Sequence, residues 1–241
     1  QLERYLSGNR KAFSVIRVPS EEEEQRRAQY RYREQLKRSL QQWASRGKSL
    51  LLSQGYLVNG RWWGPRKWTA LQEQLPFWLR QQLEQMRLMI LQIDEQERAC
   101  REQIEQSVEV PIPLGVGKLS WAVIESEVCD WKRFNNRREV SSYTGLCPGI
   151  HQSGTRARTL SINRQGNARL RCMLVEMVWR LVRWQPDYHA VKKLAQGVAK
   201  GGSRKKLVVA AARQLAVDLW RLATAQTTPD KLGLTLAPCT G

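Results

Sequence analysis

A serine in a glycine-containing, arginine-rich stretch is the residue of this sequence best suited to chemistry. The stretch runs from Phe134 to Arg171, and Ser153-Gly154 lies at its centre beside His151 and Gln152. Gly145, Pro148, Gly149 and Gly154 interrupt regular structure, so the sequence predicts a shaped loop. Six arginines lie close by: Arg137, Arg138, Arg156, Arg158, Arg164 and Arg169. Because glycine lets a backbone approach closely and a guanidinium binds two phosphate oxygens at once, this serine is placed to meet a phosphodiester.

A serine hydroxyl becomes a useful nucleophile when its proton is removed and the phosphate charge is neutralised. Ser153 is preferred over four rivals, because Ser141 and Ser142 are predicted on a helix, Ser161 on a strand-like segment and Ser203 at a helix N-cap. His151 could act as base, although we favour a polar loop residue. We predict phosphate contacts from Arg156, Arg158, Arg164, Arg169 and Arg171, of which one or two could pair instead with Glu139 or Glu176.

The same residues follow an ordered pattern, R-F-x(8)-Y-x-G-L-x-P-x(4)-S-G followed by R-x-G-N-x-x-x-R. The residues that match this pattern are Arg133-Phe134, Tyr143, Gly145-Leu146, Pro148, Ser153-Gly154, Arg164, Gly166-Asn167 and Arg171. This pattern resembles the C-terminal domain of transposases of the insertion-sequence 110 family, and the resemblance covers about residues 1–225.

The resemblance implies a DNA transposase or recombinase that cuts and rejoins strands through Ser153, with a transient phosphoserine link. It also implies a structured guide RNA, an active site shared between protomers, and an RNase H-like N-terminal domain with an acidic tetrad that binds Mg²⁺. Asp94, Glu95, Glu97 and Asp130 lie on predicted helix surfaces, so we expect no metal site in this chain. The chain is interpreted as a fragment that is inactive in strand cleavage alone.

Two alternatives from other classes stay open. One is a non-catalytic nucleic-acid-binding and dimerisation module, in which Ser153 is only structural. The other is a coiled-coil adaptor for proteins, which would show no salt-sensitive affinity for nucleic acid.

Composition favours a polyanionic partner, since 40 Lys and Arg oppose 22 Asp and Glu, a net charge of +18. The five cysteines form no C-x-x-C pair or Cys/His cluster, which fits free thiols in a reducing cytoplasm. The resemblance to insertion-sequence 110 transposases implies a bacterial cytoplasm and association with the nucleoid. The apolar run 207–212 is too short for a membrane span. We therefore expect DNA and RNA partners and no membrane association.

The coarse fold expected is mainly α. Residues 1–20 are interpreted as the tail of the upstream domain, with strand-like residues 13–19, and Ser20 is the predicted N-cap of a long helix. Apolar residues then recur every three or four positions, and Tyr32 is one of those expected to face inward. Residues 21–107 therefore predict a long antiparallel coiled-coil hairpin. Pro76 is expected either to kink the second helix or to mark its start. A dimerisation arm is favoured over an intramolecular bundle. Trp62 and Trp63 at its tip either stack on bases or pack under their own loop.

Residues 108–225 predict a compact helical domain with a short β-like loop segment, and residues 226–241 a tail of frayed coil. Gly115, Gly117 and Lys118 open a helix and resemble a helix-hairpin-helix element that binds a phosphate; an ordinary turn is the alternative. Gly201-Gly202 and Ser203 predict a helix end and a new N-cap, beside Lys200, Arg204, Lys205 and Lys206 as possible phosphate contacts. We also assign Gly154 and Asn167 to nucleic-acid binding, and His189 to a helix surface.

Overall fold

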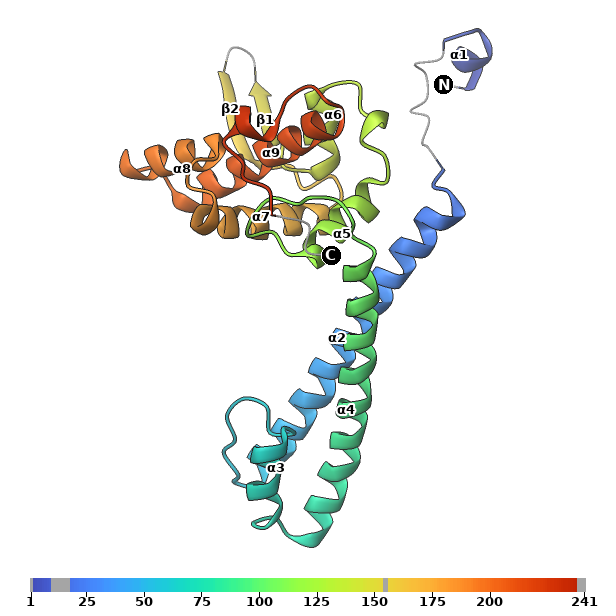
Figure 1. The fold of residues 1–241 in the computed structure, drawn as a ribbon, viewed down its shortest axis with the longest axis vertical. Coiled ribbons are helices and arrows are strands. Elements are labelled where there is room, and N and C mark those ends of the chain that lie inside the picture. The colour runs from blue at the N-terminus through green and yellow to red at the C-terminus, as the bar shows by residue number, and fades with distance from the viewer. Residues whose placement is uncertain (1, 10–17, 154–155, 238–241) are drawn as a thin grey trace.

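The computed structural model describes residues 2–9, 18–153 and 156–237, apart from the side chains of Leu2 and of residues 150–160. This part of the chain is mainly helical, which confirms the predicted fold class (Figure 1). The first elements are α1 (Leu2–Leu6), α2 (Glu21–Ser53), α3 (Pro65–Gln72), α4 (Phe77–Gln106), α5 (Lys118–Val128), the 3₁₀ turn η2 (Trp131–Arg133) and α6 (Arg137–Thr144). They are followed by β1 (Pro148–Ser153), β2 (Arg156–Ile162), α7 (Ala168–Trp184), α8 (His189–Ala199), α9 (Arg204–Ala223) and α10 (Pro229–Leu232). The strand-like segment expected at residues 13–19 lies mostly outside the described residues.

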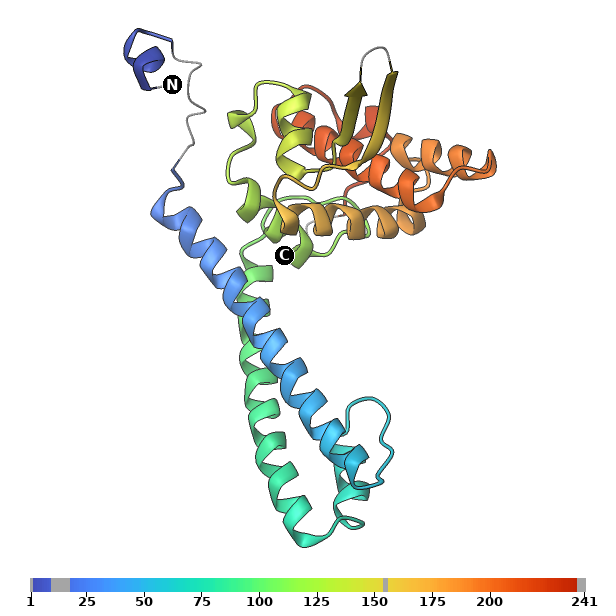
Figure 2. The same cartoon turned by 180° about the vertical axis from the view of Figure 1, so that it is seen from behind.

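Two long antiparallel helices, α2 and α4, form an arm that extends from a compact helical domain (Figures 1 and 2). The start of α2 is fixed locally, because Ser20 Oγ accepts from the Glu23 amide at 3.2 Å and Ser20 N donates to Glu23 Oε2 at 2.9 Å. Pro76 is the N-cap of α4, so the prediction that it marks a helix start is confirmed. The arm therefore exists as a helical hairpin within one chain.

The arm's tip is filled by an aromatic side chain. Trp62 is completely buried, and its Nε1 donates to the carbonyl oxygen of Ala44 in α2 at 2.9 Å. Gly47 lies directly beneath the indole. Of the two interpretations of Trp62, packing under its own loop is thus the correct one, and base stacking is excluded for this residue.

The arm's root is joined to the domain by both apolar and polar contacts. Tyr30, Cys100, Ile104 and Val123 form one buried cluster shared by α2, α4 and α5. Arg27 Nε donates to the carbonyl oxygen of Ser126 at 3.0 Å. The expectation that Tyr32 faces inward is wrong: Tyr30 is the buried residue, and Tyr32, about 200° further round α2, is half exposed.

The domain is built around α9, which packs against α7, α8 and α6. Its core holds buried residues from all these helices, including Leu174, Leu181 and Leu215, none of which has exposed surface. The antiparallel β1–β2 ribbon stands out from this helical body (Figures 1 and 2). Within the described residues, no helix has the length and apolar character needed to cross a membrane.

The chain after Gln226 is not frayed coil where the structure describes it. Leu232 and Leu234 are buried, and Ala237 N donates to the carbonyl oxygen of Ile112 at 2.8 Å. Gln185, only 2% exposed, accepts from Thr235 N through its side chain at 3.0 Å. The prediction of frayed coil was wrong because it was based on the polar, Thr-rich composition of this segment, whereas Leu232 and Leu234 complete the domain core.

Candidate nucleic-acid interface

The predicted serine lies at the end of a β-ribbon rather than in an irregular loop. Ser153 is the last residue of β1 and pairs with Arg156, the first residue of β2, while His151 pairs with Arg158. Directly opposed and alternate positions share a face of an antiparallel pair, so these four positions share one face of the ribbon. Gly154 lies outside the described residues, as do the side chains of the four. The shaped loop expected here is thus corrected to a hairpin, whereas the expected short β-like segment and the strand-like position of Ser161 are confirmed.

Two glycines in contact close the base of this hairpin. A Cβ on Gly166 would lie 2.6 Å from the carbonyl oxygen of Tyr143 and 2.9 Å from Gly145 Cα, so only glycine fits there. Asn167 N donates to the carbonyl oxygen of Tyr143 at 2.8 Å. The G-L-x-P and R-x-G-N parts of the sequence pattern therefore meet in space and fix the direction in which the ribbon leaves the domain.

Three predicted phosphate contacts near this base have partners within the chain. Asn167 Oδ1 caps α7 by accepting from the amides of Arg169 and Leu170, and its Nδ2 donates to Glu127 Oε2 at 2.6 Å. Arg171 Nη1 donates to the carbonyl oxygen of Thr144 at 3.1 Å. Arg169 Nε donates to Glu34 Oε2 at 2.9 Å, so Glu139 and Glu176 were the wrong partners. Glu139 instead accepts from the Asn135 amide.

The Arg-Phe and Tyr positions of the sequence pattern stabilise the same end of the hairpin, where it joins the domain. The Arg133 guanidinium lies 4.2 Å from the Tyr143 ring centroid and 4.7 Å from that of Phe134. Tyr143 Oη donates to the carbonyl oxygen of Glu127 at 2.6 Å. These residues hold α5, η2 and α6 together under the hairpin, which accounts structurally for the Arg-Phe and Tyr positions.

Other cations around the ribbon have no acidic partner. Arg164, Arg137 and Arg138 are exposed, and within the described residues no carboxylate lies within ion-pair distance of them. Arg164 also has a left-handed backbone, with φ 58°. Unpaired cations beside a projecting hairpin suit a polyanionic partner.

The glycine turn before α5 has the predicted geometry. Gly115 has φ 86°, and Gly117 is the N-cap of α5 with no side-chain cap bond, which leaves amides of the first turn free beside exposed Lys118. A Cβ on Gly117 would lie 3.4 Å from Arg180 Nη1. The helix dipole and two cations thus act in the same direction here. The turn is confirmed, and its ligand stays a prediction.

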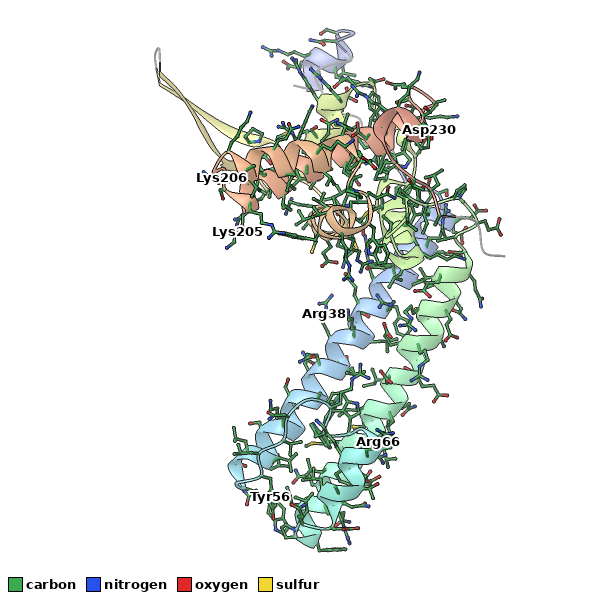
Figure 3. The ribbon with its side chains drawn as sticks, turned by 60° about the vertical axis from the view of Figure 1, so that its left-hand side comes forward. Arg38, Tyr56, Arg66, Lys205, Lys206 and Asp230 are labelled. Carbon is green, nitrogen blue, oxygen red and sulfur yellow. The ribbon has the colours of Figure 1, made fainter. Side chains whose placement is uncertain are left out.

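A second helix start, that of α9, presents Arg204, Lys205 and Lys206 as exposed residues (Figure 3). The Arg204 guanidinium lies 4.8 Å from the ring centroid of Trp179 in α7. Ser203 is the N-cap, as predicted, but its side chain makes no hydrogen bond to the amides of the first turn, so the hydroxyl is not occupied by capping as we expected. The amides at this end are therefore also open.

Sequence reasoning missed one polar cluster in the core. Asp218 is fully buried, and its Oδ2 lies 2.6 Å from His189 Nε2 and accepts from Tyr188 Oη at 2.7 Å. Burial, followed by the charge of Asp218, raises the pKa of Tyr188 well above its usual range. His189 is thus part-buried and partnered rather than a plain surface residue. A lone carboxylate inside the apolar run of α9 was the available signal.

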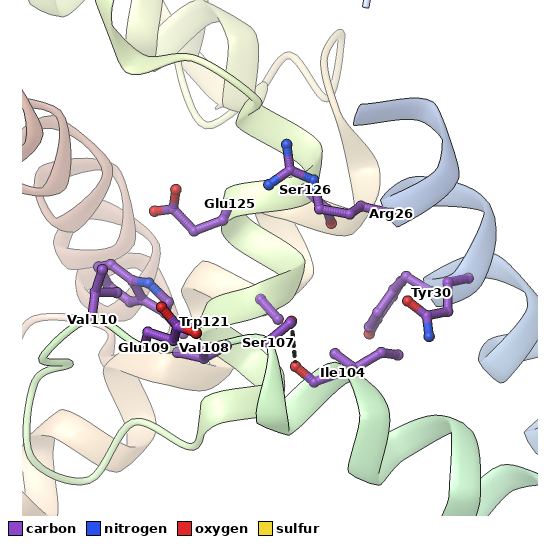
Figure 4. Close-up of a pocket in the computed structure, with 12 residues that line it drawn as sticks. Arg26, Tyr30, Ile104, Ser107, Val108, Glu109, Val110, Trp121, Glu125 and Ser126 are labelled. Carbon is purple, nitrogen blue, oxygen red and sulfur yellow. Dashed lines mark hydrogen bonds between the residues drawn. The ribbon is translucent and has the colours of Figure 1, made fainter. Parts of the chain in front are cut away.

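A cavity of about 330 Å³ opens where the arm meets the domain (Figure 4). Arg26 and Tyr30 of α2 line it opposite Trp121 and Glu125 of α5. Glu125 Oε1 accepts from Trp131 Nε1 at 3.2 Å, and burial raises the pKa of the Glu125 carboxyl. Among the described residues, no group of three or more His, Cys, Asp or Glu side chains is placed to hold a metal ion.

Comparison with known proteins finds similarity to transposases. Residues 112–193 match the sequence model of the IS116/IS110/IS902 transposase family. This similarity agrees with the predicted resemblance to insertion-sequence 110 transposases. The match ends at residue 193, whereas the domain core continues through α9 and α10.

Two relatives indicate how much of a longer protein is represented. The chain is 32% identical over 92% of its length to y4rJ of Sinorhizobium fredii, whose name provisionally calls it a transposase, and covers 63% of that protein. It is 30% identical, over 47% of its length, to the transposase for insertion sequence element IS1111A of Coxiella burnetii, and covers 32% of it. The chain therefore spans less than two thirds of the curated relatives that it matches.

Proposed function

We propose that this chain is part of a DNA transposase that cuts and rejoins DNA strands through Ser153. The observation that carries the proposal is the register of the projecting ribbon, in which Ser153 opposes Arg156 and His151 opposes Arg158. The transposase-family match over residues 112–193 and the net charge of +18 support it. A ribbon end that carries serine and arginine positions on one face suits contact with a phosphodiester.

The chemistry is a phosphoryl transfer in two steps. The Ser153 hydroxyl gives its proton to a water molecule, its Oγ forms a bond to phosphorus, and the bond from phosphorus to one deoxyribose oxygen breaks. The deoxyribose oxygen takes a proton from water and leaves as a hydroxyl. A hydroxyl of the joining strand then attacks the phosphoserine, which restores Ser153. Arg156, Arg158 and Arg164 would neutralise the charge that develops on the phosphate.

Three further parts of the proposal concern partners. A structured guide RNA would bind alongside DNA, which the excess of cations favours. Two copies would pair along the arm, where α4 exposes apolar side chains; these are Phe77, Trp78, Leu88, Met89 and Leu91. Mg²⁺ would bind an acidic tetrad on an upstream RNase H-like domain. The described residues of this chain do not fit a metal site, so the chemistry assigned to this chain includes no step through Mg²⁺.

The test is a covalent adduct. Protein that includes the upstream domain is incubated with Mg²⁺, guide RNA and radiolabelled substrate DNA, and the products are separated under denaturing conditions. We expect a labelled protein band with the unaltered sequence and none with Ser153→Ala. An adduct that survives Ser153→Ala would end the assignment.

Ser161→Ala is the matched control, because Ser161 lies on β2 of the same hairpin and is exposed. This variant is expected to keep the adduct. If both variants keep full transposition, the chain is a non-catalytic nucleic-acid-binding module instead. That alternative also predicts that Arg156→Ala weakens DNA binding and reduces its salt dependence while the Ser153 substitution changes neither.

A further inference from the structure

Two of the exposed tryptophans lie on the outer face of α7, five residues apart. Trp179 keeps 42% of its surface exposed and Trp184 keeps 53%. Arg180 and Arg183 lie between them in sequence and are also exposed. At 100° per residue, these four side chains cover an arc of about 140°, with the two arginines between the two indoles. The face is therefore aromatic at both edges and cationic in the middle.

Each indole is paired with a guanidinium. Arg204 Cζ lies 4.8 Å from the Trp179 ring centroid, and Arg183 Cζ lies 5.6 Å from that of Trp184. Such contacts hold the rings in place on the surface. Within the part of the chain that the structure describes, no carboxylate is within ion-pair distance of Arg180, Arg183 or Arg204. Their charges are consequently available to a phosphate backbone.

This face also joins two helix starts that the sequence suggested separately. Trp184 packs against Gly115, where any Cβ would come within 2.6 Å of the Trp184 side chain. Arg180 Nη1 donates to Ser120 Oγ in the first turn of α5 at 3.5 Å. At the other edge, Arg204 is the first residue of α9. A continuous surface thus runs from the α5 start across α7 to the α9 start.

We propose that this surface binds an unpaired DNA strand, with bases stacked on Trp179 and Trp184 and phosphates on Arg180 and Arg183. Every base has a flat face for an indole, whereas a duplex buries those faces between neighbouring pairs. A surface for duplex phosphates alone would not need exposed indoles. Exposed Glu176 precedes these four residues on α7. Its negative charge would repel a phosphate, so the proposed surface ends before Glu176.

The proposal rests on the proposed function, since cutting and rejoining strands produces unpaired DNA. In both views of the fold, α7 lies on the opposite side of the domain from the projecting hairpin (Figures 1 and 2). The α7 surface therefore holds a strand away from Ser153 and is not the place of chemistry. Its failure and the failure of the serine assignment can thus be distinguished.

The test is fluorescence anisotropy of the 241-residue chain with labelled oligothymidylate, oligouridylate and a blunt DNA duplex. We expect Trp179→Ala to weaken oligothymidylate binding about tenfold, as for loss of one stacked base, and duplex binding less than about twofold. Trp179→Phe keeps a flat ring and is expected to restore most of the affinity. Arg180→Gln with Arg183→Gln is expected to lower the salt slope for oligothymidylate by about 1.4.

Leu57→Ala on the arm is the control, because Leu57 is 85% exposed, lies in the loop after α2 and belongs to neither the α7 surface nor the apolar face of α4. It is expected to leave oligothymidylate affinity unchanged. The proposal is overturned if Trp179→Ala and Trp184→Ala, both with native thermal unfolding, bind oligothymidylate as the unaltered chain does. It is also overturned if duplex binding falls equally, or if oligouridylate binds about tenfold more tightly than oligothymidylate. The covalent-adduct experiment with Ser153→Ala is independent of these binding measurements, so its failure would leave the α7 proposal unaffected.

Discussion

Arg169 Nε donates to Glu34 Oε2 at 2.9 Å, a contact between residues 135 positions apart that ties the domain to the arm. Arg169 Nη1 also lies 3.8 Å from Glu127 Oε1 in α5. One guanidinium thus joins α2, α5 and α7 at the point where the arm meets the domain. A phosphate could bind Arg169 only in competition with these two carboxylates.

The first prediction is a stability coupling between Arg169 and Glu34. Both side chains are about one-third exposed, so solvent screens the pair, and we expect a coupling free energy of at most about 1 kcal/mol. A double-mutant cycle with Arg169→Ala and Glu34→Ala, followed by urea unfolding, measures it. Arg169→Ala should leave the salt dependence of DNA binding unchanged. A reduced salt slope with no coupling would instead make Arg169 a phosphate contact.

The contrast between local and long-range contacts explains what the sequence could predict. The N-cap at Ser20 was predicted correctly, and of the two predictions for Pro76, a kink or a helix start, the helix start is confirmed; both features depend on residues within one turn. The Arg33–Glu97 ion pair, 2.6 Å and nearly buried, joins two helices and has no local signal. Arg169 was predicted as a phosphate contact because its carboxylate partner, Glu34, is distant in the sequence and has no local signal either.

The hairpin shows the same limit at the candidate site. Glycines and a proline correctly marked a break between α6 and α7, but their composition could not show that residues 148–162 pair as strands. The contact of Gly145 with Gly166, which closes the base of the hairpin, joins residues that are distant in the sequence. The surface of α7 was missed because Trp179 and Trp184 are apolar in type, and exposure is known only once the core is packed.

The second prediction reverses the usual effect of glycine in a helix. Alanine normally stabilises a helix interior by about 0.5–1 kcal/mol over glycine. At Gly47, however, a Cβ would overlap the buried Trp62 indole and lie 2.7 Å from its Cε2 atom. We therefore expect Gly47→Ala to destabilise the chain by about 1–3 kcal/mol, measured by urea unfolding.

Two companion variants make the cause of this effect testable. Ser45→Ala, at an exposed position of the same helix, should change stability by less than about 0.5 kcal/mol. In a Trp62→Ala background the overlap is gone, so Gly47→Ala should become stabilising. If the substitution destabilises equally in both backgrounds, Trp62 is not the cause.

The third prediction concerns pH and Glu125. Burial raises the pKa of its carboxyl, so the folded state binds the proton more tightly than the unfolded state. Stability is therefore lost as pH rises from the unfolded pKa through the folded one. Glu125→Gln keeps an acceptor for Trp131 Nε1 and removes the charge. We expect a higher Tm at neutral pH and no difference below about pH 4.

Glu102→Gln, on the exposed face of α4, is the control for this charge change. It should have little effect on Tm at either pH. A gain for Glu125→Gln that persists undiminished below about pH 4 would show that packing, rather than ionisation, causes it.

The fourth prediction concerns the buried hydroxyl of Tyr188. Its Oη donates to the Asp218 carboxylate at 2.7 Å, and Gln214 Nε2 donates to the other oxygen at 2.9 Å. Tyr188→Phe removes a hydrogen bond to a charged group and leaves Asp218 short of a donor. We expect a loss of about 1–3 kcal/mol at neutral pH. Tyr32→Phe, at a half-exposed position, should change stability little.

Alkaline pH separates the Tyr188 hydrogen bond from simple packing. The pKa of Tyr188 is raised well above 10.0, so the folded state keeps a proton that the unfolded state loses above that pH. The stability that this tyrosine contributes is complete below pH 10.0 and falls as the pH rises towards the folded pKa. The difference between the unaltered chain and Tyr188→Phe, measured by urea unfolding, should therefore be smaller at about pH 11 than at neutral pH. A difference that is the same at both pH values would mean that the hydroxyl is ionised equally in the two states, contrary to its burial beside Asp218.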